Sequence, residues 1–238
     1  MAKIAVALQH ALAERVKKGS PGRAAPRVLA EGEGWSVNDV LCTSGPKDKP
    51  YEERHSRVSI AMVVAGSFRY RCGTGHELMT PGSLLLGNAG EFFECGHEHG
   101  EGDRCISFHY DPAYFDGIVT PVAAGRTFFR VPRVPALGAL SPLVARACTG
   151  LGSFARAVWE EMAIEVAAET AALSSGVTPS SGETTCATSE RISRVLRLIE
   201  GRPQHAFSVA ALAQEARLSP FHFLRNFQSI TGLTPHQY

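Results

Sequence analysis

The feature that most constrains the fold is a series of short β-rich runs between Trp35 and about Tyr110. They cover residues 58–66, 67–75, 83–90, 91–99 and 104–110, and Gly, Pro and Asp residues separate them. Breaks at intervals of roughly ten residues are typical of a small antiparallel barrel or jelly roll. We therefore predict an all-β domain here, in which closure of the sheet hides the strand edges.

The pattern becomes helical after a proline-rich stretch at residues 132–142. Apolar residues then recur at helical spacing, with Trp159 among them, and predict one or two helices. Their apolar face packs either on the barrel or on a second subunit, and the sequence favours neither. Residues 174–188 are rich in Ser, Thr and Gly and predict a flexible linker before a small all-α subdomain. The fold class is therefore α+β.

The N-terminal residues predict a short amphipathic helix. Ile4, Leu8, Leu12 and Val16 share one helical face, and we expect an arm that packs on the body or on a partner subunit. Polar residues interrupt any leader-like core, and no apolar run approaches the roughly 20 residues that a bilayer requires. With six cysteines in such a chain, we expect reduced thiols in the cytoplasm and no membrane contact.

The C-terminal residues have the signals of three short helices. Ser189, Ser208 and Ser219 are candidate N-caps, and Pro220 occupies a first helical position, where its missing N–H costs nothing. Phe223 and Phe227 lie one turn apart and are predicted to fill the core. Residues 189–238 hold six Arg or Lys against three Asp or Glu, which alone does not distinguish a nucleic-acid binder from an ordinary helical element.

The run SVAALAQEARLSPFHFLRNFQSITGLTPHQY resembles the first helix-turn-helix of the AraC/XylS family of transcription regulators. The resemblance implies that the last helix reads DNA bases through Phe221, Leu224 and Arg225, with His222 and Gln228 as weaker candidates. Leu224 replaces a residue that is often polar, and Arg217 replaces a frequent Gly, so the target sequence is not transferred. The matching signature positions are Ala213, Leu218, Ser219, Arg225, Phe227, Thr231, Gly232, Pro235 and Tyr238.

Family members carry two such units, whereas this chain stops at Tyr238, where a connecting helix should begin. We expect either a fragment or a natural truncation. In both cases DNA binding should be weak, because one small module buries little surface.

Residues 53–71 and 84–108 resemble, more loosely, the cupin-like sensor domains of the same family. The resemblance implies a barrel whose interior binds a small effector, and neighbouring helices that dimerise. The predicted parts are an arm (1–30), a sensor (31–130), a helical dimerisation region (131–173), the linker (174–188) and the DNA reader (189–238). The resulting hypothesis is a homodimeric one-component regulator that responds to a small molecule or metal and binds promoter DNA.

A group of His and Cys residues suggests a metal site in the sensor. Cys95, His97 and His99 alternate, so a strand would place them on one face, and such ligands suit Zn²⁺ or another borderline metal. His55, where many cupins have a metal-binding His, and Cys105 or His109 complete the candidate set. Ordinary core histidines and thiols explain the same pattern, and strand register decides whether Cys105 or Ile106 faces inward.

The alternative function is a metal-dependent cupin enzyme, or a metal or redox sensor, that uses the cluster of His55, Cys95, His97 and His99. A purely thiol-based redox role would fall to Cys95 and Cys105. Only Arg104 nearby would lower a thiol pKa. The acidic residues 91–101 read as a solvated stretch, and the sequence has no nucleophile motif, phosphate-binding Gly loop or dinucleotide fingerprint. We therefore expect a regulator and not an enzyme.

Overall fold

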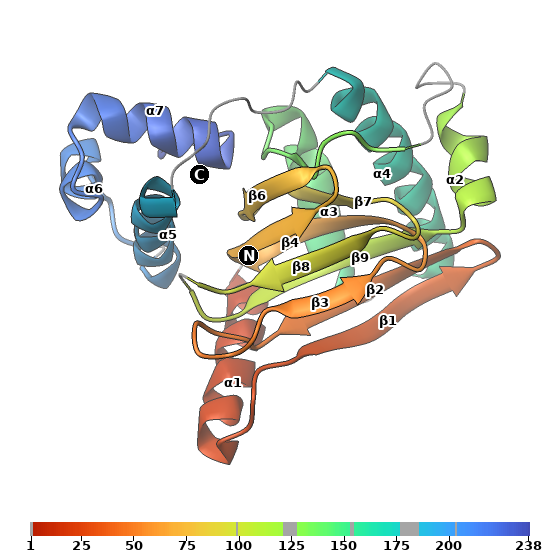
Figure 1. Ribbon diagram of the computed structural model, residues 1–238, viewed down its shortest axis with the longest axis horizontal. Coiled ribbons are helices and arrows are strands. Elements are labelled where there is room, and N and C mark those ends of the chain that lie inside the picture. Colours follow the sequence, from red (N-terminus) through yellow and green to blue (C-terminus); the bar gives the residue numbers. More distant parts are fainter. Residues whose placement is uncertain (1, 99, 121–127, 153–154, 177–185, 203) are drawn as a thin grey trace.

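The structure is a computed structural model that describes residues 2–98, 100–120, 128–152, 155–176, 186–202 and 204–238 (Figure 1). The strands are β1 (Ala24–Gly32), β2 (Trp35–Cys42), β3 (Tyr51–Arg54), β4 (Val58–Gly66), β5 (Phe68–Cys72), β6 (Gly75–Met79), β7 (Leu84–Gly87), β8 (Phe92–Gly96), β9 (Asp103–Tyr110) and β10 (Arg133–Val134). The α-helices are α1 (Ala2–Lys18), α2 (Pro112–Val119), α3 (Ser141–Gly150), α4 (Arg156–Gly176), α5 (Cys186–Gly201), α6 (Val209–Glu215) and α7 (Pro220–Thr231), and residues Gly138–Leu140 form a 3₁₀ turn.

The strands form two antiparallel sheets. The larger has the order β1-β2-β9-β4-β7-β10, and the smaller has the order β3-β8-β5-β6. A shared cluster that includes Val63 of the larger sheet and Tyr70 of the smaller sheet fills the space between them, and both side chains are fully buried. The predicted antiparallel β domain and the α+β class are thus confirmed.

The predicted β runs correspond to β4, β5, β7, β8 and β9. The sheet also includes β1, so residues 24–30, expected in the N-terminal arm, are strand. This strand lies at the edge of the larger sheet, and its residues Ala25–Val28 are exposed. A strand with little buried surface lacks the alternation of apolar and polar residues by which strands are recognised, so the pattern did not indicate it.

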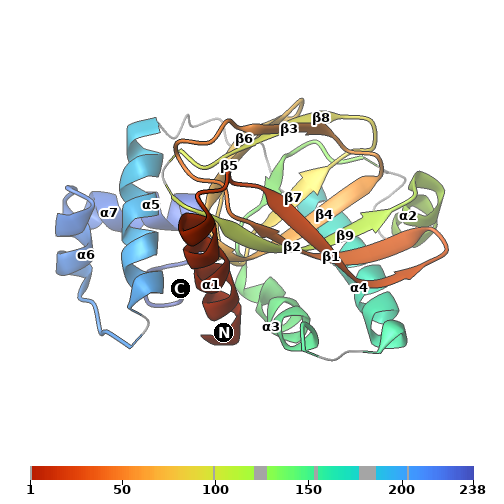
Figure 2. The ribbon, with the colours of Figure 1, turned by 90° about the horizontal axis from the view of Figure 1, so that it is seen from below.

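Helices α2, α3 and α4 cover the other face of the larger sheet, away from the smaller sheet (Figure 2). Trp159 and Met162 of α4 are buried against Phe108 of β9, and the Tyr110 hydroxyl donates a hydrogen bond to the Ala163 carbonyl at 2.7 Å. The apolar face of α4 therefore packs on the sheet of its own chain. Because both faces of β9 are covered, Cys105 faces the space between the sheets and Ile106 faces the helices.

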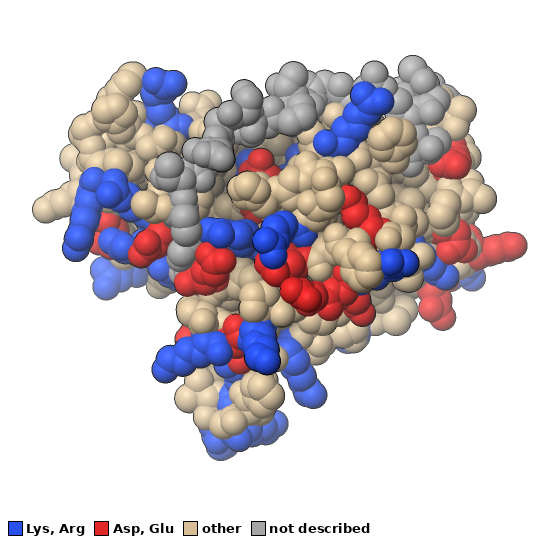
Figure 3. Space-filling model, viewed as in Figure 1, with Lys and Arg blue, Asp and Glu red and all other residues tan. Residues whose placement is uncertain are grey.

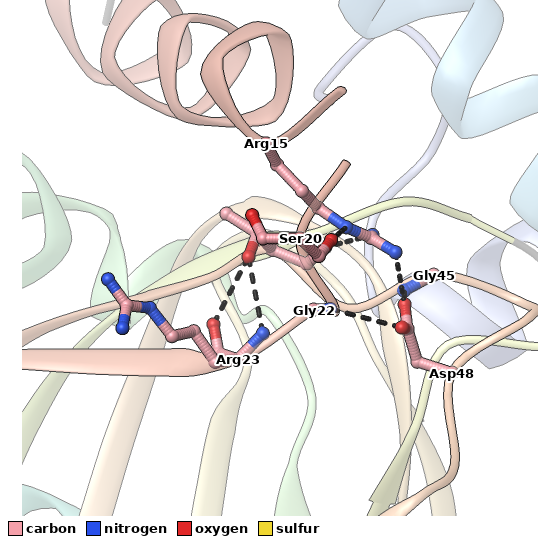
Figure 4. Close-up of polar contacts among 7 residues, drawn as sticks. Arg15, Ser20, Gly22, Arg23, Gly45 and Asp48 are labelled. Atoms are coloured by element: carbon pink, nitrogen blue, oxygen red, sulfur yellow. Dashed lines mark hydrogen bonds and ion pairs between the residues drawn. The ribbon is translucent and has the colours of Figure 1, made fainter. Parts of the chain in front are cut away.

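Helix α1 also packs on the body of its own chain. Leu8 and Leu12 contact a small cluster around Ala65, whereas Val16, predicted on the same face, is 76% exposed. The end of α1 is fixed by Arg15, which bonds to the carbonyls of Ser20 and Thr43 and pairs with Asp48 at 2.7 Å (Figure 4).

Asp48 is the centre of this junction. Its carboxylate accepts bonds from the backbone N–H groups of Gly22 at 3.0 Å and Gly45 at 2.7 Å (Figure 4). The Gly22 bond, the Gly45 bond and the Arg15 charge together outweigh partial burial and lower the pKa of Asp48. The loop after β2 is thereby held against α1.

Helices α5, α6 and α7 share a separate core that contains Ile192, Val195, Phe223 and Phe227. Helix α5 begins at Cys186, before the predicted cap Ser189, and α4 extends to Gly176, so helices occupy both ends of the predicted linker. Residues 177–185 lie outside the described part of the chain.

None of the described helices is sufficiently long and apolar to cross a bilayer. The cysteines whose side chains the structure describes are free thiols: Cys42, Cys72, Cys95, Cys105 and Cys148.

Candidate functional site

Helices α6 and α7 form a helix-turn-helix whose starts are fixed by serine caps. The Ser208 hydroxyl accepts a bond from the N–H of Ala211 at 3.1 Å. The Ser219 hydroxyl accepts one from the N–H of His222 at 3.4 Å and lies 2.9 Å from His222 Nδ1. These two predicted caps are confirmed, and Pro220 occupies the first turn of α7.

The turn between the two helices depends on Arg217. This residue has a φ of 52°, in the left-handed region, and its N–H bonds to the Gln214 carbonyl at 3.0 Å. Glycine adopts this conformation without steric cost, whereas an arginine pays for the contact of its Cβ with the backbone. The Arg217 side chain is exposed.

Helix α7 has one buried and one exposed face. Phe223 and Phe227 are fully buried, with ring centroids 5.5 Å apart, as predicted. Phe221 is 65% exposed, and the Arg225 guanidinium lies 5.8 Å from the centre of its ring. All five predicted DNA contacts lie on the solvent-exposed surface: Phe221, His222, Leu224, Arg225 and Gln228.

Charged side chains are unevenly distributed over the molecule. In Figure 3, acidic side chains gather over the strands, whereas basic ones are frequent around the C-terminal helices and at the end of α1. This distribution agrees with the basic balance of residues 189–238.

The helix-turn-helix contacts the β domain through Arg133 of β10. The Arg133 guanidinium donates bonds to the carbonyls of Leu78 at 2.8 Å and Ile230 at 2.5 Å, and lies 3.6 Å from Glu77. Burial lowers the pKa of Arg133, and the charge of Glu77 opposes this shift. Gly232, which ends α7 with a φ of 83°, lies against the backbone of Ala136 so closely that a Cβ would be 2.4 Å from its carbonyl oxygen.

A cleft of about 510 Å³ lies between the barrel loops and α5. It is lined by Pro46, Glu98, Gly100, Glu101, Glu190 and Arg197. By contrast, the space between the sheets is occupied by large buried side chains such as Phe68, Tyr70 and Met79.

The predicted metal ligands do not form one group among the described residues. His55 lies flat on Phe93, with ring centroids 4.1 Å apart, and its Nε2 is 2.9 Å from the Tyr70 hydroxyl. Burial and the nearby His109 lower the pKa of His55 to about 4. His99 lies outside the described residues. His55 is therefore a buried core histidine in this structure, although the resemblance to cupins grouped it with His97.

His97 instead meets two residues that were not predicted as ligands. Its Nε2 lies 2.7 Å from Asp103 Oδ1, and one ligand atom from each of Cys42, His97 and Asp103 lies within 4.8 Å of the others. Burial disfavours the charged form of His97, but bonds to Asp103 and Cys42 outweigh it and raise its pKa to about 10. Cys42 and Asp103 face each other across the β2–β9 ladder, a relationship that the sequence alone does not contain.

Cys95 and Cys105 lie close to this group. The Cys105 thiol is 3.3 Å from Asp103 Oδ2. Burial, followed by the Asp103 charge, raises the pKa of both thiols well above the usual range. Protonated, buried thiols are poor nucleophiles, so this environment does not favour the alternative of a redox role for Cys95 and Cys105.

Comparison with known proteins gives one family match. Residues 199–238 match the model of the bacterial regulatory helix-turn-helix proteins of the AraC family. This segment contains α6, the Arg217 turn and α7. None of the curated proteins compared with the chain is a match.

Solved structures align with about two fifths of the chain. They include a putative mannose-6-phosphate isomerase from Ralstonia eutropha, which is 21% identical with a TM-score of 0.33 and covers 39% of this chain and 88% of its own. A cupin superfamily protein from Desulfitobacterium hafniense is 10% identical with a TM-score of 0.33 and covers 39% and 81%. The cupin domain of Schizosaccharomyces pombe Cnp3 is 9% identical with a TM-score of 0.34 and covers 40% and 72%.

Proposed function

The chain carries an AraC-family helix-turn-helix in residues 199–238, and from this premise we propose that it is a transcription regulator that binds promoter DNA in response to an effector. The observation that carries the proposal is the exposed face of α7 within the matched segment. A recognition helix must turn base-reading side chains outward while its other face holds the domain together. The buried Phe223 and Phe227 hold the domain together, and the opposite, exposed face of α7 is available to read bases.

The side chains on this face suit the major groove. Arg225 can donate two hydrogen bonds to a guanine, and Phe221 and Leu224 can contact thymine methyl groups. His222 and Gln228 add hydrogen-bonding groups beside them. We assign a phosphate contact to Arg217, which is exposed at the turn; such contacts contribute affinity without sequence preference.

Response to an effector requires that the effector bind two arrangements of the chain with different affinity. The contacts of Arg133 with Ile230 and of Gly232 with Ala136, and the cleft between the loops of the β domain and α5, offer a route by which a change in the sensor alters the position of α7. The effector is a small molecule or a metal. The packed space between the sheets leaves more room for an ion than for an organic molecule.

We further propose a homodimer that acts in the cytoplasm, where promoter DNA is accessible. Two copies would place two recognition helices on successive half-sites. Since the apolar face of α4 is covered by its own sheet, dimerisation through residues 131–173 would use other side chains, such as Ile164, which is 42% exposed. The family match favours a regulator over the alternative of a metal-dependent enzyme.

The test is DNA binding by the chain at low salt, measured by fluorescence anisotropy with the DNA upstream of its own gene and a shuffled control. We expect tighter binding to the upstream DNA. Arg225→Ala should abolish the preference for the upstream DNA. The matched control is Arg23→Ala, which removes an exposed arginine directly before β1 and should retain this preference. Equal affinity of the wild-type chain for both DNAs would contradict the proposal.

A further inference from the structure

Cys42 meets His97 and Asp103, which lie far from it in the sequence, at the end of the β domain nearest α1. Cys42 ends β2, Asp103 begins β9 opposite it, and His97 follows the last residue of β8. Their ligand atoms all lie within 4.8 Å of one another. His97 is 6% exposed and Asp103 is 5% exposed, so the group is withdrawn from solvent.

The chemistry of this group is that of a transition-metal site. Thiolate, imidazole and carboxylate are the three side-chain ligands that Zn²⁺ takes in proteins, and this mixture does not suit Mg²⁺ or Ca²⁺, which prefer oxygen ligands alone. We propose that Cys42, His97 and Asp103 bind a Zn²⁺-class divalent metal ion.

The charges of the proposed ligands also favour a divalent metal ion. A Cys thiolate and a carboxylate together neutralise a divalent ion, while His binds as the neutral imidazole. Binding therefore releases the proton of the Cys42 thiol and any proton that His97 carries, so the affinity falls as the pH is lowered. No electron is transferred.

The geometry requires only a small adjustment. Zinc–ligand bonds of 2.0–2.3 Å separate tetrahedral ligand atoms by about 3.2–3.8 Å. The 2.7 Å contact between His97 and Asp103 must therefore lengthen, while a separation at the 4.8 Å limit of the group would shorten by about 1 Å. The Cys105 thiol, 3.3 Å from Asp103 Oδ2, is a candidate for the fourth position.

The site lies beneath a turn that contacts other parts of the chain. The N–H of Gly102 bonds to the Ser44 carbonyl at 2.8 Å, and a Cβ on Gly102 would be 2.9 Å from Leu8 of α1. Gly100, in the same turn, lies near Arg197 of α5, whose guanidinium would be 3.5 Å from a Cβ there. A metal here would thus stiffen a turn that contacts both α1 and the DNA-reading part. Metal binding itself does not depend on the proposed function.

The test uses Co²⁺ as a spectroscopic substitute for Zn²⁺, added to the reduced, metal-free chain. We expect one equivalent to bind with tetrahedral d–d absorption and a thiolate-to-cobalt charge-transfer band, and one equivalent of Zn²⁺ to displace it. Cys42→Ser should remove the charge-transfer band if no other thiol binds, or reduce it if Cys105 binds too. It should also weaken binding by more than about 100-fold, since losing a residue that only supports a ligand costs roughly 10–100-fold.

The control is Cys72→Ser, which removes a thiol that bonds to Thr74 outside the group and should leave the spectrum unchanged. Far-ultraviolet circular dichroism checks the fold of each variant. Failure of the folded wild-type chain to bind Co²⁺, or an unchanged spectrum and affinity in Cys42→Ser, would overturn the proposed site. Because the readout is metal binding, it is independent of DNA binding.

Discussion

Arg133 donates a hydrogen bond to the carbonyl oxygen of Ile230, 2.5 Å away, and so joins the last strand of the larger sheet to the last turn of α7. The last four carbonyls of a helix have no partner within the helix, and the C-terminal end of its dipole attracts a positive charge. The buried guanidinium of Arg133 supplies both the hydrogen-bond donor and the positive charge. The position of α7 is therefore coupled to β10 and, through the Leu78 carbonyl, to β6.

Replacement of this arginine should loosen the junction. We expect Arg133→Leu to leave the carbonyls of Leu78 and Ile230 without their donor and to destabilise the chain by about 1–3 kcal/mol. Hydrogen exchange in the last turn of α7 should increase. The matched control is Arg130→Leu, because Arg130 is exposed and contacts only the Phe128 ring among its described partners. Similar protection of α7 in both variants would show that Arg133 does not fix the helix.

The turn of the helix-turn-helix offers a stabilising substitution. Arg217 holds a φ of 52°, which costs a residue with a Cβ roughly 1–2 kcal/mol. We expect Arg217→Gly to raise the free energy of unfolding by about 1 kcal/mol, part of the gain being offset by the greater freedom of glycine in the unfolded chain. Arg217→Ala removes the same side chain but retains the backbone strain, so urea unfolding should show no comparable rise in the free energy of unfolding.

Two exposed arginines should contribute differently to DNA binding. Loss of the Arg225 guanidinium should cost about 1–3 kcal/mol with the target sequence and little with shuffled DNA, because a base contact is lost. Arg217→Ala should weaken binding to both DNAs and reduce the slope of log affinity against log salt by about one. Anisotropy titrations at several salt concentrations measure both quantities. Identical effects of the two substitutions on both DNAs would contradict these roles.

The sequence predicted the elements whose signals are local. Ser208 and Ser219 define helix starts through bonds to residues three positions on, and Pro220 marks the first turn of α7, where its missing N–H costs nothing. Phe223 and Phe227 define a buried helical face. These features were therefore found in the structure as expected. The family resemblance added the role of α7, which no periodicity could supply.

The sequence did not predict the features that depend on strand register. Alternation put Cys95, His97 and His99 on one face but gave no information on which residues of other strands face them. The pairing of Cys42 with Asp103 across β2 and β9 created a group around His97 that lacks His55. The contact between Arg133 and Ile230 joins residues 97 positions apart, and nothing local to either residue predicts it.

The burial of His55 predicts a loss of stability in mild acid. Its pKa is about 4 in the folded chain, lowered by burial and by His109 from an ordinary value of 6.5. Between these values the unfolded state binds a proton that the native state does not, so the free energy of unfolding falls as the pH falls from 6.5 towards 4. At about 1.4 kcal/mol per pH unit, His55 contributes a loss of about 3 kcal/mol across this window.

Urea unfolding at several pH values should show a shallower pH dependence in His55→Gln, because glutamine does not titrate. His10→Gln, which changes an exposed histidine, should keep the wild-type slope. If His55→Gln also kept that slope, the acid sensitivity would belong to other groups, and His55 would already be accessible to protons in the native state.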